Sequence, residues 1–292
     1  RNATGVKKRQ TGSSVYEEIR RDIMKIGNRY FDTEHECYIM GILNVTPDSF
    51  SDGGQWNDID KARKHVADMI EEGAAIIDVG GESTRPGHTQ ITIEEEIQRV
   101  VPVIRMIKEN FDIPVSIDSY KSHVVEAALK AGADMVNDIW GFKYDRGVAE
   151  LTAQFQIPCC LMHNRDNTDY KDFLTEMCQD LRESVKIAKA AGVSDENIIL
   201  DPGVGFGKTY EQNLQAINHL ELLKEIGYPV LLATSRKSVI GRALDLPSDQ
   251  RVEGTVVTTV MGVEKGASFV RVHDVKENKR AIQMTQAILR EQ

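Results

Sequence analysis

Short apolar runs and longer amphipathic stretches follow one another along this chain in a regular order. The first run, residues 38–45, is apolar throughout except for Asn44 near its end, as in a parallel strand buried on both faces. A helical pattern follows at 58–72, where Ala62, Val66 and Met69 share one face. Seven further strands are expected at 75–79, 114–117, 135–139, 158–162, 198–200, 229–233 and 269–272.

A helix is expected after each of these strands. Thr92 and Glu95 form a capping box that starts one of them, and Gly132 and Gly192 are suited to end two others. Eight strand–helix pairs with short connections predict a single (β/α)₈ TIM barrel of the α/β class, spanning residues 24–292. The remaining helices are expected at 121–131, 147–155, 170–191, 210–226, 237–244, 249–264 and 275–290.

The N-terminal residues 1–23 do not share this pattern. Residues 1–14 are polar and basic without periodicity, which indicates a linker or the remnant of a processed end, and a short helix could start at Ser14. Residues 24–26 and 29–31 flank Gly27-Asn28, a two-residue turn with glycine first, and this predicts a β-hairpin. A hairpin directly before the first strand is placed to plug the bottom of the barrel.

Composition excludes several classes of function. The 292 residues are 41% hydrophobic and 28% charged, with a net charge of −9, which argues against binding to nucleic acid or to anionic membranes. The four cysteines lack zinc-type spacing, and Cys159-Cys160 lies in an apolar run typical of reduced core residues. Because no apolar run is long enough to span a membrane, we expect a cytoplasmic protein.

Polar side chains follow or end nearly every expected strand. A single polar residue at a strand end is unremarkable, because a solvated loop explains it. Eight strand ends of this kind instead favour a catalytic rim, since active sites of TIM barrels lie at the carboxyl ends of the strands. The residues at these positions include Asn44, Asp118, Asn137, His163, Asp201, Lys237, Arg271 and His273.

Two features of the sequence suggest nucleotide or metal binding at first, but their residue spacing does not match the known motifs. The segment from Gly203 to Thr209 suggests a phosphate-binding P-loop, but the Walker spacing requires glycine where Pro202 stands, and the dinucleotide fingerprint fails too. The histidines other than His273 have no metal-binding spacing, and we expect most of them on helix or loop surfaces. They are His35, His65, His88, His123, His163 and His219.

Taken as a set, seven segments resemble those of dihydropteroate synthases, in order and from Tyr38 to the C-terminus. One mild departure is Ala233, where many members have glycine. Residues 1–23 lie outside the resemblance, and some lineages fuse the synthase to an upstream pyrophosphokinase. The segments are residues 41–54, 78–87 (Asp-Val-Gly-Gly-Glu-Ser-Thr-Arg-Pro-Gly), 115–118, 137–138, 201–208 (Asp-Pro-Gly-Val-Gly-Phe-Gly-Lys), 234–238 and 271–274.

The resemblance implies a transferase of folate biosynthesis. It would condense 6-hydroxymethyl-7,8-dihydropterin diphosphate with p-aminobenzoate and release pyrophosphate with the help of Mg²⁺. Asp201 would accept hydrogen bonds from two adjacent pterin donors, and Lys237 would bind the neighbouring carbonyl. The other residues expected to contact the pterin are Asp118, Asn137, Ile139, Met162, Phe206 and Arg271.

The remaining roles that the resemblance implies concern the diphosphate and the arylamine. Asn44, Arg85, Arg271 and His273 would stabilise the leaving group, with Asn44 also meeting Mg²⁺. Loop residue Asp48 is a further catalytic candidate. The p-aminobenzoate pocket would be formed by Phe50, Thr84, Pro86 and Ser238. Sulfonamides would compete for this pocket, and the family suggests a homodimer through barrel helices.

No pair of nucleophile and general base is visible, and an arylamine needs none at neutral pH. We therefore expect a dissociative mechanism, in which the C–O bond ionises before the amine attacks. Two other readings stay open from the sequence. One is a pterin-binding methyltetrahydrofolate–corrinoid methyltransferase, and the other is a non-catalytic pterin-binding paralogue. The diphosphate-binding set and the first loop favour the synthase over both.

Overall fold

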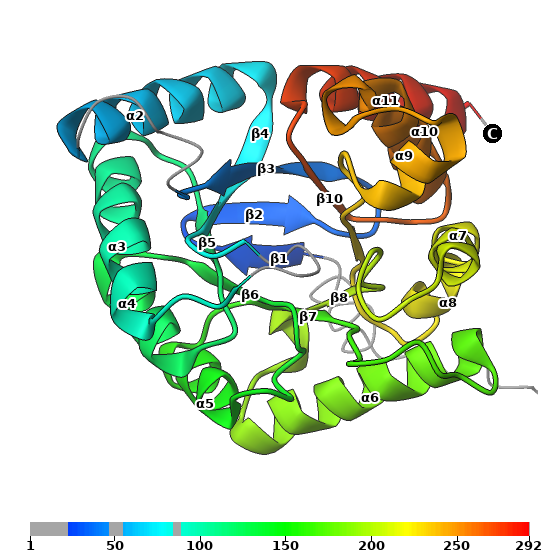
Figure 1. Ribbon diagram of the computed structural model, residues 1–292, viewed down its shortest axis with the longest axis horizontal. Coiled ribbons are helices and arrows are strands. Elements are labelled where there is room, and N and C mark those ends of the chain that lie inside the picture. Colours follow the sequence, from blue (N-terminus) through cyan, green and yellow to red (C-terminus); the bar gives the residue numbers. More distant parts are fainter. Residues whose placement is uncertain (1–22, 47–54, 84–88, 292) are drawn as a thin grey trace, which may run out of the picture.

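The computed structural model of the protein describes residues 23–46, 55–83 and 89–291 (Figure 1). Eight parallel strands form one sheet in the order β8-β7-β6-β5-β4-β3-β10-β9, and a bridge between Leu200 and Val230 joins its two edges. The sheet is therefore a closed barrel, as predicted. Its strands are β3 (Tyr38–Asn44), β4 (Ala74–Gly80), β5 (Val115–Asp118), β6 (Met135–Asp138), β7 (Cys159–Met162), β8 (Ile198–Asp201), β9 (Leu231–Leu232) and β10 (Phe269–Val272).

A ring of helices surrounds the strands in chain order, from α2 in blue to α11 in red (Figure 1). The helices are α2 (Gln55–Glu72), α3 (Ile93–Asn110), α4 (Ser122–Ala131), α5 (Arg146–Phe155), α6 (Phe173–Ala191), α7 (Tyr210–Asn218), α8 (Glu221–Lys224), α9 (Ser238–Leu244), α10 (Val252–Glu264) and α11 (Val275–Leu289), with 3₁₀ turns at Asp195–Asn197 and Ser248–Gln250.

Several of the expected helices differ in their bounds, and two of these differences have a visible cause. Helix α6 begins at Phe173 rather than at 170, because the Asp172 side chain accepts the backbone N–H of Thr175 and caps the helix there. The stretch expected at 210–226 is divided into α7 and α8, since His219 leaves the helical conformation with a φ of −117° and a ψ of 35°.

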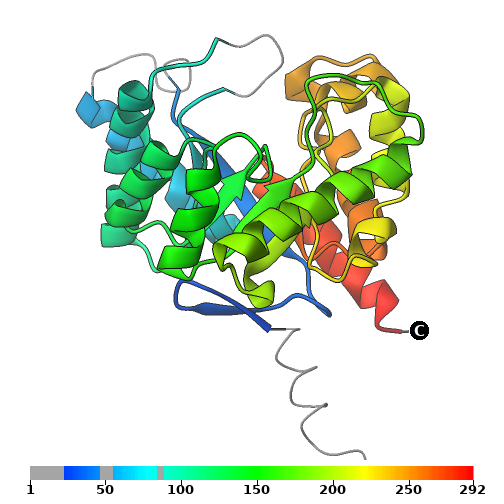
Figure 2. The same ribbon diagram turned by 90° about the horizontal axis from the view of Figure 1, so that it is seen from below.

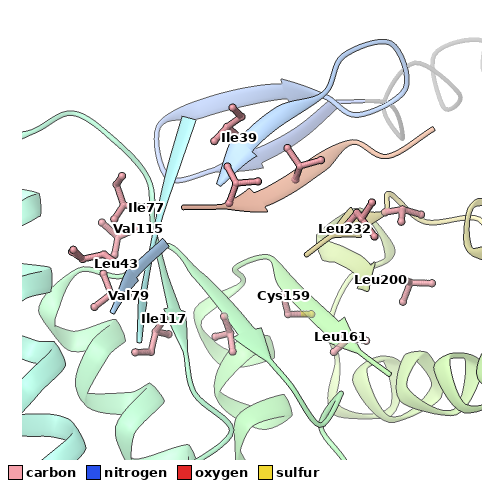
Figure 3. Close-up of a cluster of buried hydrophobic side chains, with 14 of the residues drawn as sticks. Ile39, Leu43, Ile77, Val79, Val115, Ile117, Cys159, Leu161, Leu200 and Leu232 are labelled. Atoms are coloured by element: carbon pink, nitrogen blue, oxygen red, sulfur yellow. The ribbon is translucent and has the colours of Figure 1, made fainter. Parts of the chain in front are cut away.

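Alternate residues of each strand point to opposite sides of the barrel wall. The outward side chains pack against the helices and form the large hydrophobic core, part of which is shown in Figure 3, including Leu43, Ile77, Val115, Leu161 and Leu232. The apolar side chains that point into the barrel near the start of the strands form what we call the lower layer. It consists of Met40, Ile76, Met135, Cys160, Ile199, Leu231 and Phe269.

An N-terminal hairpin closes the lower end of the barrel, as predicted. Strands β1 (Ile23–Ile26) and β2 (Arg29–Asp32) pair antiparallel around Gly27, whose φ of +59° suits glycine. Figure 2 shows the hairpin lying across one end of the barrel. Met24, Ile26 and Phe31 are buried and pack with the lower layer in one cluster.

Cys159 and Cys160 lie in the core, as predicted from the apolar run that contains them. Cys37, Cys159, Cys160 and Cys178 are free and buried, and burial raises the pKa of the Cys37 thiol to about 12. These thiols therefore act as small apolar core residues. Among the described residues, no helix is both long and apolar enough to cross a membrane.

Candidate active site

A cavity of about 1140 Å³ opens at the carboxyl ends of the barrel strands. The candidates Asp48, Phe50, Thr84, Arg85 and Pro86 lie outside the described residues. Every other site residue predicted from the sequence lines the cavity, so that one space gathers side chains from seven βα units. These residues are Asn44, Asp118, Asn137, Ile139, Met162, Asp201, Phe206, Lys237, Ser238, Arg271 and His273.

The strand register explains why these polar groups converge. Asp118 on β5 lies opposite Asn137 on β6, and Met162 on β7 lies opposite Asp201 on β8. Gly80 on β4 lies between Asn44 and Asp118, and a Cβ atom there would stand 3.4 Å from Oδ2 of Asp118. The absence of a side chain at Gly80 therefore leaves room for its polar neighbours.

Arg271 is the centre of a buried ion network. Its Nε donates to Oδ2 of Asp78 at 2.6 Å, and one terminal nitrogen donates to Oδ2 of Asp118 at 2.8 Å. Nδ2 of Asn137 also donates to Oδ2 of Asp78, at 3.2 Å. We call Asp78, Asp118, Asn137, Asp201 and Arg271 the upper layer, because their side chains lie above the lower layer inside the barrel.

Burial and charge oppose each other in this network. Burial raises the pKa of Asp118 to about 7, although the neighbouring Arg271 acts to lower it. Burial also disfavours the charge of Arg271, but Asp78 and Asp118 outweigh it and raise the pKa of the guanidinium. Arg271 therefore stays a cation, while Asp118 can take up a proton near neutral pH.

Sequence reasoning assigned no role to Asp78, which is fully buried in the middle of β4. The sequence does indicate a special role for Asp78, because a carboxylate inside an otherwise apolar strand must pair with a cation or accept several hydrogen bonds. The sequence could not say which cation it meets, since Arg271 is 193 positions further along the chain.

Asp201 and Lys237 form the second charged part of the cavity. Oδ1 of Asp201 accepts the backbone N–H of Gly203 at 2.7 Å, and Nζ of Lys237 donates to the carbonyl of Val204 at 2.6 Å. Burial raises the pKa of Asp201, and it lowers that of Lys237 to about 8, with each group opposing the shift of the other. Nζ of Lys237 also lies 5.0 Å from the centroid of the Phe206 ring.

An apolar wall faces these charges. Tyr120, Ile139 and Met162 form a small buried cluster, with Trp140 and Phe206 packed against it. The Asp138 carboxylate accepts the backbone N–H groups of Trp140 and Phe142 at 2.7 and 3.0 Å and so fixes the turn that carries Ile139. Flat, polar-edged rings fit a space that has apolar faces and charged ends.

His273 and Ser235 are coupled at the rim. Oγ of Ser235 accepts the backbone N–H of His273 at 3.0 Å and lies 2.9 Å from its Nδ1. The serine thereby holds the imidazole against the end of the barrel. Sequence reasoning quoted Ser235 in a motif without giving it a function, because a serine after a strand is common in loops.

A third network supports the connection between β4 and α3. Glu82 accepts hydrogen bonds from the hydroxyl of Tyr120 at 2.7 Å, from Nζ of Lys121 at 2.6 Å and from the backbone of Ile91 at 2.9 Å. Lys121 also binds Glu96 at 2.8 Å. The described ends of this connection are thus held together by a buried lysine between two carboxylates.

Most of the remaining histidines were expected on the surface, and His35, His65 and His123 are indeed exposed, whereas His163 is an exception. Its side chain is buried at the end of β7, where Nδ1 lies 2.8 Å from Nζ of Lys208 and Nε2 lies 3.0 Å from Oδ2 of Asp180. Burial lowers the pKa of His163 to about 4. Met162 faces the cavity, so the next residue along the chain, His163, points the other way, toward Asp180 on α6.

The expected Mg²⁺ has only one protein ligand among the candidates. In the described ranges, no group of three or more His, Cys, Asp and Glu residues is arranged to hold a metal. Asn44 is exposed at the end of β3 and lines the cavity near its anion-binding candidates. Mg²⁺ is often held by few protein oxygens together with water and substrate phosphates, so Asn44 fits an ion that enters with a diphosphate.

A family model described as pterin-binding enzyme matches residues 40–273. Dihydropteroate synthase of Clostridium beijerinckii is 64% identical over 91% of this chain and 100% of its own length. Among solved structures, dihydropteroate synthase from Clostridium difficile in the presence of pteroic acid has a TM-score of 0.87 and 52% identity, covering 89% of this chain and 99% of that one. The Yersinia pestis enzyme in complex with a sulfonamide drug has a TM-score of 0.86 and 38% identity over 92% and 100%.

Proposed function

The chain belongs to the pterin-binding enzymes and, among them, to the dihydropteroate synthases, and we propose that its cavity carries out the condensation catalysed by these transferases. In that reaction 6-hydroxymethyl-7,8-dihydropterin diphosphate and p-aminobenzoate give 7,8-dihydropteroate and pyrophosphate. The observation that carries the proposal is that one cavity is lined both by a buried carboxylate, Asp201, and by the potential anion-binding side chains Arg271 and His273.

Asp201 is the group best suited to the pterin edge. A carboxylate only accepts hydrogen bonds when it is ionised, and the pterin offers a ring N–H and an exocyclic amine side by side. The backbone of Gly203 already fixes Oδ1 of Asp201. Lys237 lies close enough to lower the pKa of Asp201 against the effect of burial, and it would bind the adjacent pterin carbonyl.

The other face and edge of the pterin have matching groups. Asn137 and Asp118 lie side by side on neighbouring strands and offer an amide and a carboxyl group to the remaining ring nitrogens. Ile139 and Met162 supply the apolar wall, with Phe206 packed against them. Burial raises the pKa of Asp118 to about 7, so it could either donate to or accept from the ring at neutral pH.

The diphosphate would lie toward Arg271, His273 and Asn44. The bonds to Asp78 and Asp118 use only some of the N–H groups of the Arg271 guanidinium, and they hold it as a preorganised cation. Stabilising charge that develops on a leaving group is a large contribution to catalysis, because the donors need no reorganisation. Mg²⁺ bound at Asn44 would supply further positive charge to the same oxygens.

The order of events that we propose is ionisation followed by capture. The C–O bond to the diphosphate breaks, both its electrons leave with the pyrophosphate, and the dihydropterin delocalises the cation left on the methylene carbon. The neutral amine of p-aminobenzoate then forms the C–N bond and loses a proton. Because an arylamine is already a nucleophile, this route requires no dedicated general base.

The p-aminobenzoate pocket would lie at the mouth of the cavity, where Ser238 begins α9. Its other candidates, Phe50, Thr84 and Pro86, lie outside the described residues. A sulfonamide shares the aniline end of p-aminobenzoate and carries a polar group opposite it. We therefore expect sulfonamides to compete for this pocket and not for the pterin side.

We further propose that the protein is a cytoplasmic homodimer. Apolar side chains are exposed along α10 and α11, including Val257, Met284 and Ile288, which are 58–61% exposed. Such side chains on neighbouring helices are suited to a surface shared between two copies. Sedimentation at several protein concentrations, with Val257→Asp and Met284→Asp as disrupting changes, would measure this association.

The function is tested by pyrophosphate release from the purified protein. We expect release with Mg²⁺ that requires both substrates at steady state, because unreacted cation and pyrophosphate recombine without the amine. Release that never depends on p-aminobenzoate, or methyl transfer from methyltetrahydrofolate to a corrinoid, would contradict the proposal. Pterin binding without any turnover would indicate the non-catalytic paralogue instead.

A further inference from the structure

A half-buried lysine lies directly behind the loop that follows β8. The Nζ atom of Lys208 is within hydrogen-bond distance of four acceptors. They are Nδ1 of His163 at 2.8 Å, the carbonyls of Gly203 and Phe206, each at 2.9 Å, and the carbonyl of His163 at 3.4 Å. Burial lowers the pKa of Lys208 to about 7, and in its protonated form the side chain has three N–H groups to share among these acceptors. Lys208 is not among the residues that line the cavity, so it reaches the loop from the protein side.

Lys208 belongs to a series of polar contacts that continues through His163 and Asp180 to Arg165. If Nδ1 of His163 accepts from Lys208, the hydrogen of the neutral imidazole is on Nε2, where it can donate to Oδ2 of Asp180 at 3.0 Å. The same Oδ2 accepts from Nε of Arg165 at 2.7 Å. Burial lowers the pKa of His163 to about 4, which agrees with a neutral ring in this position.

The loop that Lys208 holds has little freedom to take another shape. Gly203 and Gly207 have φ values of +68° and +54°, and a Cβ on Gly203 would lie 1.9 Å from the carbonyl oxygen of His163. The backbone N–H of His163 also donates to the carbonyl of Asp201 at 2.9 Å. The strand end that bears His163 is therefore packed tightly against the loop.

Each part of this loop contributes to the side of the cavity assigned above to the pterin. Asp201 begins the loop, the carbonyl of Val204 binds Lys237, and Phe206 presents its ring beneath the ammonium of Lys237. The carbonyls of Gly203 and Phe206, on either side of Val204, both bind Lys208. Two lysines thus bind opposite sides of one short segment. Lys237 binds it from the cavity, and Lys208 binds it from the side that faces away from the cavity.

We propose that Lys208 is a positioning residue for pterin binding, which acts through the loop carbonyls and is itself oriented by His163 and Asp180. It does not touch the substrate. It fixes the loop so that the Asp201 carboxylate, the Phe206 ring and the Lys237 ammonium are presented together. The inference rests on the proposed function, because it takes this side of the cavity to be the pterin site.

The test compares Lys208→Met, which keeps the length of the side chain and removes its donors, with the surface control Lys130→Met. The Lys130 side chain is 67% exposed and pairs only with the neighbouring turn through Glu126. We expect Lys208→Met to raise the Kd for a pterin lacking the diphosphate by roughly ten- to a hundredfold, as for the loss of hydrogen bonds from a charged donor. The KM for p-aminobenzoate at saturating pterin diphosphate should change by less than about threefold, and Lys130→Met should match the wild type.

Amine rescue distinguishes positioning from general damage. In Lys208→Ala, propylamine supplies the missing ammonium, so it should lower the pterin Kd toward the wild-type value and leave the wild type unaffected. If Lys208→Met does not fold, Asp180→Asn tests the role of Lys208 instead, because Asp180 orients the His163 ring that Lys208 contacts. We expect this change to raise the pterin Kd about threefold or more.

A folded Lys208→Met protein with wild-type pterin affinity would overturn the role of Lys208, as would wild-type affinity in Asp180→Asn where that variant decides. An equal loss for both substrates without rescue by the amine would also overturn it. Failure of the wild-type protein to bind the pterin would instead contradict the proposed function itself.

Discussion

The two layers inside the barrel share four strands, β4, β6, β8 and β10, and have opposite chemistry there. In the lower layer Ile76, Met135, Ile199 and Phe269 pack against the hairpin without any polar group among them. Two residues further along the same strands stand Asp78, Asn137, Asp201 and Arg271. Because a strand repeats every two residues, both sets point into the barrel. One step of about 7 Å along each of these four strands therefore separates an apolar core from a charged cavity.

Because of this difference, the two layers should contribute differently to the stability of the fold and to ligand binding. The lower layer is closed by the hairpin and stabilised by burial of apolar surface, which is non-directional. The upper layer depends on ion pairs whose partners come from distant parts of the chain, and each charge is tolerable only while its partner is present. Changes in the lower layer should therefore affect unfolding alone, and changes in the upper layer should affect ligand binding as well.

The largest expected effect comes from Arg271→Ala. The change leaves Asp78 and Asp118 buried without their cation, and loss of one partner of a buried pair costs about 3–5 kcal/mol of stability. Pterin affinity and turnover should fall with it, whereas Arg63→Ala on the exposed face of α2 should alter neither. Urea unfolding and steady-state kinetics measure both effects. An Arg271→Ala protein as stable as the wild type would show that the ion network contributes nothing to the fold.

Phe31→Ala breaks the lower layer by a different mechanism. Phe31 is buried against Tyr38 and Phe269, with ring centroids 4.9 and 5.8 Å away, so its removal leaves a cavity. We expect a loss of about 3–4 kcal/mol in unfolding free energy. Below the melting temperature, pterin affinity should stay within about threefold of the wild type. A large loss of affinity in the folded variant would mean that the two layers are coupled.

Asp201→Asn acts on the upper layer with little change in volume. The amide presents an NH₂ group where the pterin needs an acceptor, and unmatched donors in a buried site cost roughly 2–5 kcal/mol of binding. Calorimetry with a pterin lacking the diphosphate measures the loss. Asp68→Asn, on the exposed surface of α2, is the matched control. Near-normal affinity in Asp201→Asn would remove this residue from pterin recognition.

The network behind the upper layer should also make stability depend on pH. His163 has a folded pKa of about 4, and an unfolded imidazole takes up its proton near pH 6.5. Between these values only the unfolded chain binds the proton, so stability falls as the pH drops from about 6.5 to 4, by roughly 3 kcal/mol at most. Buried Asp118 and Asp138, whose pKa values burial raises to about 7, have the opposite dependence.

Comparison with His163→Gln isolates the histidine from these carboxyl groups. The difference in unfolding free energy between wild type and variant should shrink as the pH falls through this window, because the variant has no imidazole to protonate. Urea denaturation at several pH values gives that difference directly. A difference that is constant from pH 7 to pH 4 would contradict the buried, neutral state of His163.

The barrel and most of its polar layer could be predicted from sequence because both follow from local patterns. Apolar runs give parallel strands, and a polar residue that ends such a run, as in Asp118 or Asp201, must face the rim. The partner of Asp78 could not be predicted, since no local pattern relates β4 to Arg271 on β10. The burial of His163 was missed because its contacts, Lys208 and Asp180, lie on two other elements.

The most direct test of the account is a crystal structure with the pterin diphosphate and Mg²⁺ in the absence of p-aminobenzoate. We expect the pterin edge on the Asp201 carboxylate, its ring along Met162, and the phosphorus atoms beside Arg271 and His273, with the bond to the methylene carbon cleaved or partly cleaved. A pterin ring bound away from Asp201 would contradict the assignment of the upper layer. A fully intact diphosphate that reacts only when the arylamine is added would contradict ionisation before attack.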